Sequence, residues 1–373
     1  MIKIIEKYNC CGCSACVQVC PRQCIRMEED SEGFLYPIVS VDDCINCGKC
    51  EKVCPMLNQR HPNVPRSVFA AINQNDDIRS ESSSGGVFSE LSRMILEIGG
   101  VVFGVAFNDK WETEHICITT IKDIYKIRGS KYSQSIINNT YIEVKKYLNN
   151  NIPVLFSGTP CQVLGLKNYL NKDYNNLLTI DVVCHSVPSP KVWRFYLNTL
   201  LKNQNKQFDD IKTIKFRDKK EGWYQYGFSI LFKDDKVLFH KRNRNPYLKG
   251  YLKDFFSRPS CHHCPAKKLS SGSDITLADF WGVQNICNKM FDNEGTSLVI
   301  CNTEHGKCWI EKANLSVAII DYNEASKYNK AIENVSKPNQ RRNEFFKLIT
   351  KHTVSYSVWK LLIKNKIFGF WGK

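Results

Sequence analysis

The sequence predicts a small α+β module over residues 1–58, followed by a larger α/β domain built around a mixed β-sheet. The module is predicted by two matched runs of cysteines, with a short apolar segment at 33–41 between them. The larger domain is predicted because strand-like and helix-like segments alternate after the module. We expect a linker at 59–66, the large domain at 67–330 and a basic helical tail at 331–373.

Eight cysteines form two runs with the spacing C-x2-C-x2-C-x3-C-P, each ending on a proline, Pro21 or Pro55. Bacterial proteins that hold two [4Fe–4S] clusters have this spacing, and the fourth cysteine of each run binds the cluster of the other run. The sequence therefore predicts two clusters, one bound by Cys10, Cys13, Cys16 and Cys54, the other by Cys44, Cys47, Cys50 and Cys20.

The spacing has a physical reason. Three thiolates two residues apart lie on a loop short enough to hold three corners of one cubane, and the proline ends the short helix after the fourth. Gly12 and Gly48 let the backbone approach the cluster closely. The alternatives are zinc knuckles and a disulfide framework, but zinc sites take four ligands, commonly as two separated C-x2-C pairs.

Composition limits the classes of function. The chain has 373 residues, with 52 Lys and Arg against 37 Asp and Glu, a net charge of +15. Two oxidised clusters, each adding about −2, bring this to roughly +11. A basic surface suits an acidic redox partner, a phosphorylated cofactor or an anionic substrate. The chain contains no arginine-rich run or aromatic RNA-binding motif, which argues against nucleic acid.

The eighteen cysteines do not indicate a secreted protein, because eight are assigned to clusters and no signal peptide precedes Cys10. No apolar stretch reaches the length of a membrane span. We therefore expect a cytoplasmic protein. The basic, aromatic segment 359–371 is expected to form a terminal helix docked on the body or on a partner subunit, with peripheral membrane contact as the alternative.

The large domain is expected to contain strands at 101–107, 154–157 and 178–184 and helices at 86–98, 140–148, 162–170 and 190–201. Longer strands are expected at 211–217 and 226–240, with a turn at Asp234-Asp235. Residues 82–89, Ser-Ser-Ser-Gly-Gly-Val-Phe-Ser, open a helix. Free N–H groups and the helix dipole favour a phosphate there, and an ordinary serine N-cap is the alternative.

Four further cysteines could hold a third cluster. Cys161 begins a helix after a buried strand, a position that favours ionisation of the thiol. Cys184 ends the next strand, and Cys261 and Cys264 form one more C-x2-C pair. The alternative is two core cysteines and a zinc or surface pair. The remaining cysteines are expected to be structural: Cys11, Cys24, Cys117, Cys287, Cys301 and Cys308.

Taken in chain order, seven motifs resemble the family of coenzyme F₄₂₀ hydrogenase/dehydrogenase β-subunits. They extend from about residue 69 to residue 283 and read SSSGGVFSEL, RGSKYSQS, SGTPCQVLGLKNYL, VVCHSVPSPKVW, FRDKKEGW, RPSCHHC and SDITLADFWG. An N-terminal ferredoxin module occurs in many members.

The resemblance implies an iron–sulfur flavoprotein whose large domain binds FAD. It implies that the FAD pyrophosphate is held by Ser84, Gly85 and Gly86, and that the flavin site is lined by Ser130, Lys131, Tyr132, Gly158 and Thr159. Members without the ferredoxin module retain one cluster, which favours a third cluster on Cys161, Cys184, Cys261 and Cys264. Lys131 and His185 are the candidate proton donors, with a core histidine as the alternative for His185.

Three functions are compatible with these features. The leading hypothesis is an oxidoreductase in which FAD exchanges electrons with the clusters, acting in bacterial polysaccharide biosynthesis on an activated or lipid-linked sugar. The second is an electron-transfer subunit of a larger oxidoreductase with no substrate of its own. The third is a cluster-stabilised structural or nucleic-acid-binding protein without flavin. The expected electron partner is a ferredoxin, NAD(P)H or a deazaflavin, and we expect a homo-oligomer.

Overall fold

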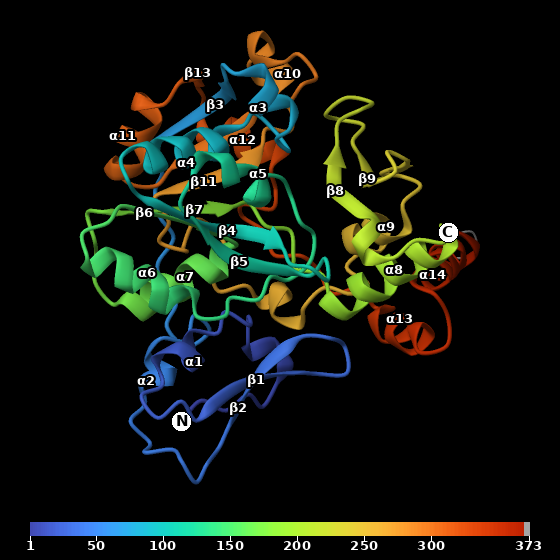
Figure 1. The fold of residues 1–373 in the computed structure, drawn as a ribbon, viewed down its shortest axis with the longest axis horizontal. Helices are drawn as coiled ribbons and strands as arrows, with labels where there is room; N and C mark the ends of the chain where they lie inside the picture. Colours follow the sequence, from blue (N-terminus) through green and yellow to red (C-terminus); the bar gives the residue numbers. More distant parts are fainter. Residues whose placement is uncertain (369–373) are drawn as a thin grey trace.

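The cysteine module is organised by two short helices and one hairpin. A computed structural model describes residues 1–368 (Figure 1). Helices α1 (Ala15–Val19) and α2 (Lys49–Lys52) lie within the two cysteine runs, and each begins after a left-handed residue, Ser14 or Gly48. Strands β1 (Ile25–Glu29) and β2 (Leu35–Val39) pair antiparallel between the two runs. The backbone thus turns sharply beside both groups of cysteines.

The large domain contains an eight-stranded sheet in the order β13-β3-β12-β11-β7-β6-β4-β5. Its strands are β3 (Ser67–Asn73), β4 (Val101–Phe107), β5 (Thr113–Ile118), β6 (Val154–Gly158), β7 (Leu177–Val182), β11 (Ile275–Asp279), β12 (Ser297–Cys301) and β13 (Leu315–Ile319). The four central strands, β4, β6, β7 and β11, pair parallel with one another. The outer strands, β5 on one side and β12, β3 and β13 on the other, pair antiparallel. This confirms the predicted α/β domain with a mixed sheet.

Helices cover both faces of the sheet and bury its apolar side chains. One face packs against α4 (Val87–Glu97), α5 (Ile124–Ile127) and α11 (Glu304–Lys312). The other packs against α6 (Thr140–Asn149) and α7 (Pro160–Leu170) near β4 and β6, and against α10 (Val283–Ile286) and α12 (Tyr322–Tyr328) near β3 and β12. A further short helix, α3 (Asp76–Ser80), follows β3.

A second, three-stranded sheet lies beside the first and packs on the remaining helices (Figure 1). Its strands are β8 (Ile211–Asp218), β9 (Gly227–Phe232) and β10 (Val237–Lys241). They share a core with α8 (Pro190–Asn203), α9 (Pro246–Leu252), α13 (Arg342–Ile349) and α14 (Val354–Phe368). The terminal helix is therefore docked on the body, and residues 369–371 of the predicted terminal segment lie outside the described residues. Within residues 1–368, no helix is long and apolar enough to cross a membrane.

The expected elements from 86 to 241 are found within a few residues of their predicted ends. The predicted turn at Asp234-Asp235 is confirmed: it divides 226–240 into β9 and β10, and Asp235 adopts a left-handed φ of 60° there. Strands β3, β12 and β13 were not predicted individually. Strand β3 pairs with both β12 and β13, which lie more than two hundred residues further along the chain, and such distant partners leave no local signal.

The module is fixed to the large domain by ion pairs and hydrogen bonds. Arg194 forms an ion pair with Glu29 at 2.6 Å, and Arg342 forms one with Glu32 at 2.6 Å. On the other side, Gln18 Oε1 accepts a hydrogen bond of 2.8 Å from the Tyr141 N–H. Figure 1 shows the module, drawn in blue, lying below α6 and α7 of the large domain. The two parts therefore form a continuous body.

We expect Trp193→Ala to destabilise the body strongly. Trp193 is 1% exposed, and its ring lies 4.9 Å from that of Phe216. Removing a buried Trp side chain costs about 3–5 kcal/mol, which lowers the thermal midpoint by roughly 10 °C in a domain of this size. Circular dichroism measures the midpoint. Phe195→Ala, on the same helix but 40% exposed, is the control and should shift it by less than about 3 °C. Equal shifts in both variants would contradict this packing.

Candidate functional site

A cavity of about 310 Å³ lies at the carboxyl ends of the parallel strands. Strands β6, β7 and β11 end beside it at Gly158, Val182 and Asp279, and α4 begins beside it at Val87. Open α/β sheets bind ligands at this edge, because the loops after the strands surround a crevice and helices there present free N–H groups. The cavity is therefore the candidate cofactor site.

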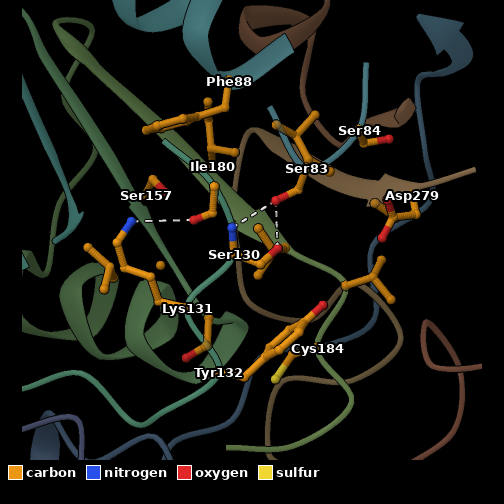
Figure 2. Close-up of a pocket in the computed structure, with 18 of the residues that line it drawn as sticks. Ser83, Ser84, Phe88, Ser130, Lys131, Tyr132, Ser157, Ile180, Cys184 and Asp279 are labelled. Atoms are coloured by element: carbon orange, nitrogen blue, oxygen red, sulfur yellow. Dashed lines mark hydrogen bonds between the residues drawn. The ribbon is translucent and has the colours of Figure 1, made fainter. Parts of the chain in front are cut away.

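The serine-rich loop before α4 forms one wall of the cavity (Figure 2). Ser83 Oγ accepts hydrogen bonds from the Ser130 N–H at 2.8 Å and from the Ser130 hydroxyl at 3.0 Å. These bonds join the loop at 82–86 to the loop at 128–135. Gly86 ends the first loop with a left-handed φ of 82°, which starts α4 toward the cavity.

The three residues predicted to hold a pyrophosphate have different positions. Ser84 and Gly86 line the cavity, and the Ser84 hydroxyl donates to the Thr296 carbonyl at 2.8 Å. Gly85 is not among the lining residues. A Cβ on Gly85 would lie 2.3 Å from the Ala71 carbonyl oxygen, so this glycine allows the loop to pack against β3. Pyrophosphate binding by these residues stays a prediction.

A buried hydrogen-bond network beneath the cavity was not predicted. His115 Nε2 lies 3.1 Å from the Ser157 carbonyl oxygen, and Nδ1 lies 3.1 Å from Ser135 Oγ. Because a carbonyl only accepts, Nε2 carries the proton and Nδ1 accepts from the hydroxyl. Gln162 donates to the same hydroxyl at 2.9 Å and accepts from the Thr159 N–H at 2.9 Å. Burial lowers the pKa of His115 to about 4, so the ring stays neutral and holds this wall in place.

Lys131 extends along the cavity wall (Figure 2). Its Nζ donates to the Arg128 carbonyl at 3.0 Å. Burial lowers the pKa of Lys131 to about 7, because an ammonium removed from water has lost hydration that a carbonyl oxygen restores only in part. The amine can therefore bind or release a proton near neutral pH.

The other predicted lining residues also surround the cavity. They are Ser130, Tyr132, Gly158, Thr159 and His185. His185 Nε2 lies 3.1 Å from Asp254 Oδ2, so the imidazole has a carboxylate partner rather than an apolar core environment. The ring centres of Tyr132 and Tyr251 lie 4.9 Å apart, with the planes tilted by 31°. Burial raises the pKa of Tyr132 to about 12, which keeps its phenol protonated.

Four cysteines from three segments gather between the cavity and the module. We call Cys161, Cys184, Cys261 and Cys264 the third set. Cys184 also lines the cavity. Burial, and to a smaller extent the neighbouring thiols of Cys161 and Cys264, raises the pKa of Cys184 to about 12. Burial and the thiol of Cys161 likewise raise the pKa of Cys264 to about 11. The thiols that change one another's pKa lie close together, as ligands of one cluster must.

The predicted easy ionisation of Cys161 is wrong for the free thiol. A hydrogen bond with Cys11, together with burial, raises the pKa of Cys161 well above its ordinary value and outweighs the helix N-terminus. The sequence predicts only a structural role for Cys11. It lies between Cys161 and the ligand-run residue Cys13, both of which affect the pKa of Cys11. The first cysteine run therefore touches the third set.

The two runs of the module are brought together in the crossed arrangement. We call Cys10, Cys13, Cys16 and Cys54 the inner set, and Cys20, Cys44, Cys47 and Cys50 the outer set. All four outer-set cysteines line one small pocket, and Cys47 is exposed. Burial and the nearby thiols of Cys10 and Cys54 raise the pKa of Cys16. The outer set thus reaches solvent through Cys47, and the inner set contacts the large domain through Cys13.

Cubane binding by the three cysteine sets stays a prediction. Across residues 1–368, no three His, Cys, Asp or Glu side chains converge closely enough to hold one metal ion. A cubane binds each thiolate through a different iron, so its ligands stay apart. A fifth cysteine, Cys24, lies 3.4 Å from Cys20 in the outer pocket, although the sequence predicts only a structural role for it.

Comparison with protein families finds matches over most of the chain. The C-terminal model of the coenzyme F₄₂₀ hydrogenase/dehydrogenase beta subunit matches residues 153–325, and the N-terminal model of that same protein matches residues 68–142. Two 4Fe-4S dicluster domain models match residues 9–57 and 43–89.

Two individual proteins are also similar. One of the subunits of the F₄₂₀H₂ dehydrogenase from Methanosarcina mazei is 24% identical over 278 residues, which cover 70% of this chain and 73% of that protein. A chain of the F420-reducing [NiFe] hydrogenase complex from Methanosarcina barkeri, solved in a xenon derivatization study, is 17% identical. It matches with a TM-score of 0.47 over 83% of this chain and 94% of that one.

We expect Lys131 to react with acetic anhydride at a lower pH than the exposed lysines. Its pKa of about 7 leaves half of the amine neutral at that pH, whereas ordinary lysines, with a pKa of about 10.4, stay protonated. Mass spectrometry of peptides labelled between pH 6 and pH 10 gives the profile of each lysine. A Lys131 profile that coincides with those of the exposed lysines would contradict the burial of its amine.

Proposed function

Since the chain belongs to the family of coenzyme F₄₂₀ hydrogenase/dehydrogenase beta subunits and matches a 4Fe-4S dicluster domain, we propose that it is the electron-transfer subunit of a larger oxidoreductase. The observation that carries the proposal is the order of its cysteines. The cavity, the third set, the inner set and the exposed outer set follow one another across the molecule, and Cys184 belongs to both the cavity and the third set.

FAD is the proposed occupant of the cavity. Bound there, a flavin would exchange electron pairs with a hydride carrier and single electrons with clusters. The residues fit this group: the first N–H groups of α4 lack intrahelical partners and suit a phosphate, and the serine and glycine loops leave room beside it. Ser83 and Ser130 hold the two loops at a fixed separation.

Two side chains are proposed to handle protons in the cavity. Lys131 holds a proton at Nζ that is exchangeable near pH 7, and His185 is oriented by Asp254. The aromatic pair Tyr132 and Tyr251 also lines the cavity and would limit the access of water to these groups. The proposed hydride carrier is a deazaflavin or a nicotinamide, in keeping with the name of the Methanosarcina mazei relative.

The name of the Methanosarcina mazei relative describes one part of a larger dehydrogenase, which favours this function over that of an enzyme with its own sugar substrate. The isolated protein should therefore reduce dyes when supplied with a hydride carrier or dithionite, without turning over a metabolite. Its physiological partner would accept or donate electrons at the exposed outer set.

Protein purified without oxygen should contain about twelve irons and one FAD, four irons for each set of cysteines. Cys161→Ser should lower the iron content by about four per chain, because a cubane that loses one of its thiolates is poorly retained. Iron and sulfide assays measure the change. Cys308→Ser, at an exposed cysteine outside the three sets, is the control and should keep all of the iron. Unchanged iron in Cys161→Ser would remove the third cluster from the proposal.

Ser83→Val should lower the FAD content at least threefold, because valine cannot accept the two hydrogen bonds that hold the 128–135 loop. Flavin released by denaturation is measured by fluorescence. Ser80→Ala, in the short helix α3 and outside the cavity, is the matched control and should keep a full complement. Equal FAD content in the two variants would move the flavin site elsewhere.

A further inference from the structure

One arginine is fully buried between the module and the large domain. Arg258 is 0% exposed and precedes the short 3₁₀ helix η4 (Pro259–His263) that carries Cys261. Its backbone N–H donates to the Val187 carbonyl at 3.0 Å, and its carbonyl accepts from the Cys261 N–H at 3.0 Å. The residue is therefore anchored in the loop of the third set.

The guanidinium of Arg258 reaches across to the first cysteine run. Nε donates to the Cys10 carbonyl at 2.8 Å, and Nη2 lies 3.5 Å from Cys10 Sγ and donates to the Leu35 carbonyl at 2.9 Å. Nη1 donates to Gln134 Oε1 at 2.9 Å, and Gln134 in turn donates to the Cys11 carbonyl at 3.0 Å. The positive charge is thus held against an inner-set ligand.

The backbone of the first run is shaped to admit this side chain. Gly12 has a left-handed φ of 72°, and a Cβ there would lie 2.8 Å from Arg258 Nη1 and 2.9 Å from its guanidinium carbon. The guanidinium also stacks on Tyr36, with its central carbon 4.4 Å from the ring centre. A glycine is required at this position because of both the backbone conformation and the arginine.

The charge of Arg258 lacks an ordinary counter-ion. After burial, the groups with the largest electrostatic effect on Arg258 are Cys10, Tyr36, Cys11 and Cys261, and no Asp or Glu carboxylate among the described residues forms an ion pair with it. A buried, unpaired cation is costly, since several kcal/mol of hydration are lost per ion. An anion at the inner set is the partner that would offset this cost.

We propose that Arg258 is a tuning residue that raises the reduction potential of the inner-set cluster and has that cluster as its counter-ion. The proposal rests on the proposed function, because it requires a cluster on Cys10, Cys13, Cys16 and Cys54. One-electron reduction adds one negative charge to the thiolate-bound cluster and needs no proton. A fixed cation beside Cys10 Sγ stabilises the more negative form in a medium of low dielectric constant, so reduction becomes more favourable.

The cations that line the outer pocket, the Met1 ammonium, Arg22 and Lys49, are all exposed, unlike Arg258. Cys47 is exposed, so water screens charges near it, whereas Cys10 and Cys13 of the inner set are buried. Arg258 therefore acts on one of the two clusters. It would make the inner set the preferred electron acceptor of the pair and direct electrons toward the large domain.

The test is a redox titration of the whole protein followed by electron paramagnetic resonance. In Arg258→Gln, whose amide can still donate hydrogen bonds but carries no charge, the equilibrium constant for reducing the inner cluster relative to the outer one should fall at least tenfold, or about 59 mV for one electron. Arg258→Lys, which keeps the charge but loses the fork of hydrogen bonds, should show a fall of about two- to fivefold. Cys47→Ser identifies the outer-cluster signal, because it changes only that set.

Arg342→Gln is the matched control. Arg342 crosses the same interface to Glu32 and bonds the Ser257 carbonyl, but contacts no inner-set cysteine. This variant should leave both potentials unchanged. Unchanged potentials in Arg258→Gln, or an equal fall in Arg342→Gln, would overturn the proposal. If Arg258→Gln loses the inner cluster, Arg258→Met, which also removes the charge but keeps a long side chain, decides, and an unchanged constant in that variant overturns the proposal.

The iron content of the wild-type protein distinguishes a failure of the Arg258 proposal from a failure of the proposed function. Wild-type protein without about eight irons in the module would refute the electron-transfer function itself. Wild-type protein with those irons, and variants with unchanged potentials, would refute only the role of Arg258.

Discussion

The close approach of the first cysteine run to the large domain constrains the rest of the molecule. A Cβ on Gly165, in the second turn of α7, would lie 3.1 Å from Cys13 Sγ, and Cys11 shares a hydrogen bond with Cys161 at the start of the same helix. Only a residue without a side chain lets the helix lie this near a cluster loop. The position of α7 in turn fixes the end of β6 and, through Gln162, the floor of the cavity.

The charge of the chain is divided between its two parts. Residues 1–58 contain six Lys and Arg against eight Asp and Glu, a net charge of −2, whereas residues 59–373 contain 46 against 29, a net charge of +17. Arg194 and Arg342 of the large domain pair with Glu29 and Glu32 of the module. The composition predicts a basic surface that attracts an acidic redox partner. Part of that positive charge is instead paired with the acidic module of the same chain. Clusters in the module would deepen this asymmetry, because each adds about −2 when oxidised.

Local patterns explain why parts of the fold and site could be predicted. Each cysteine run spans only about a dozen residues, so its spacing is visible in the sequence. Strands such as β4 and β6 are apolar segments between turns, so their composition identified them. Ser83 and Lys131 lie in motifs next to glycines, which also made the cavity loops visible. Arg258 could not be found in this way, since its partner Cys10 is 248 residues distant and a buried arginine has no pattern of its own. His115 was missed for the same reason, because its network joins β5, the 128–135 loop and α7 only after folding.

The distribution of the cysteines along the chain has a consequence for biogenesis. The inner and outer sets are complete by residue 54, and each is closed by short loops, so their ligands can gather while the remainder of the chain is still being synthesised. The third set extends from Cys161 to Cys264, on α7, after β7 and around η4, and its members meet only when the large sheet has formed. Iron delivery would therefore occur in two stages, with the site nearest the cavity filled last, after the polypeptide around it has acquired its tertiary structure.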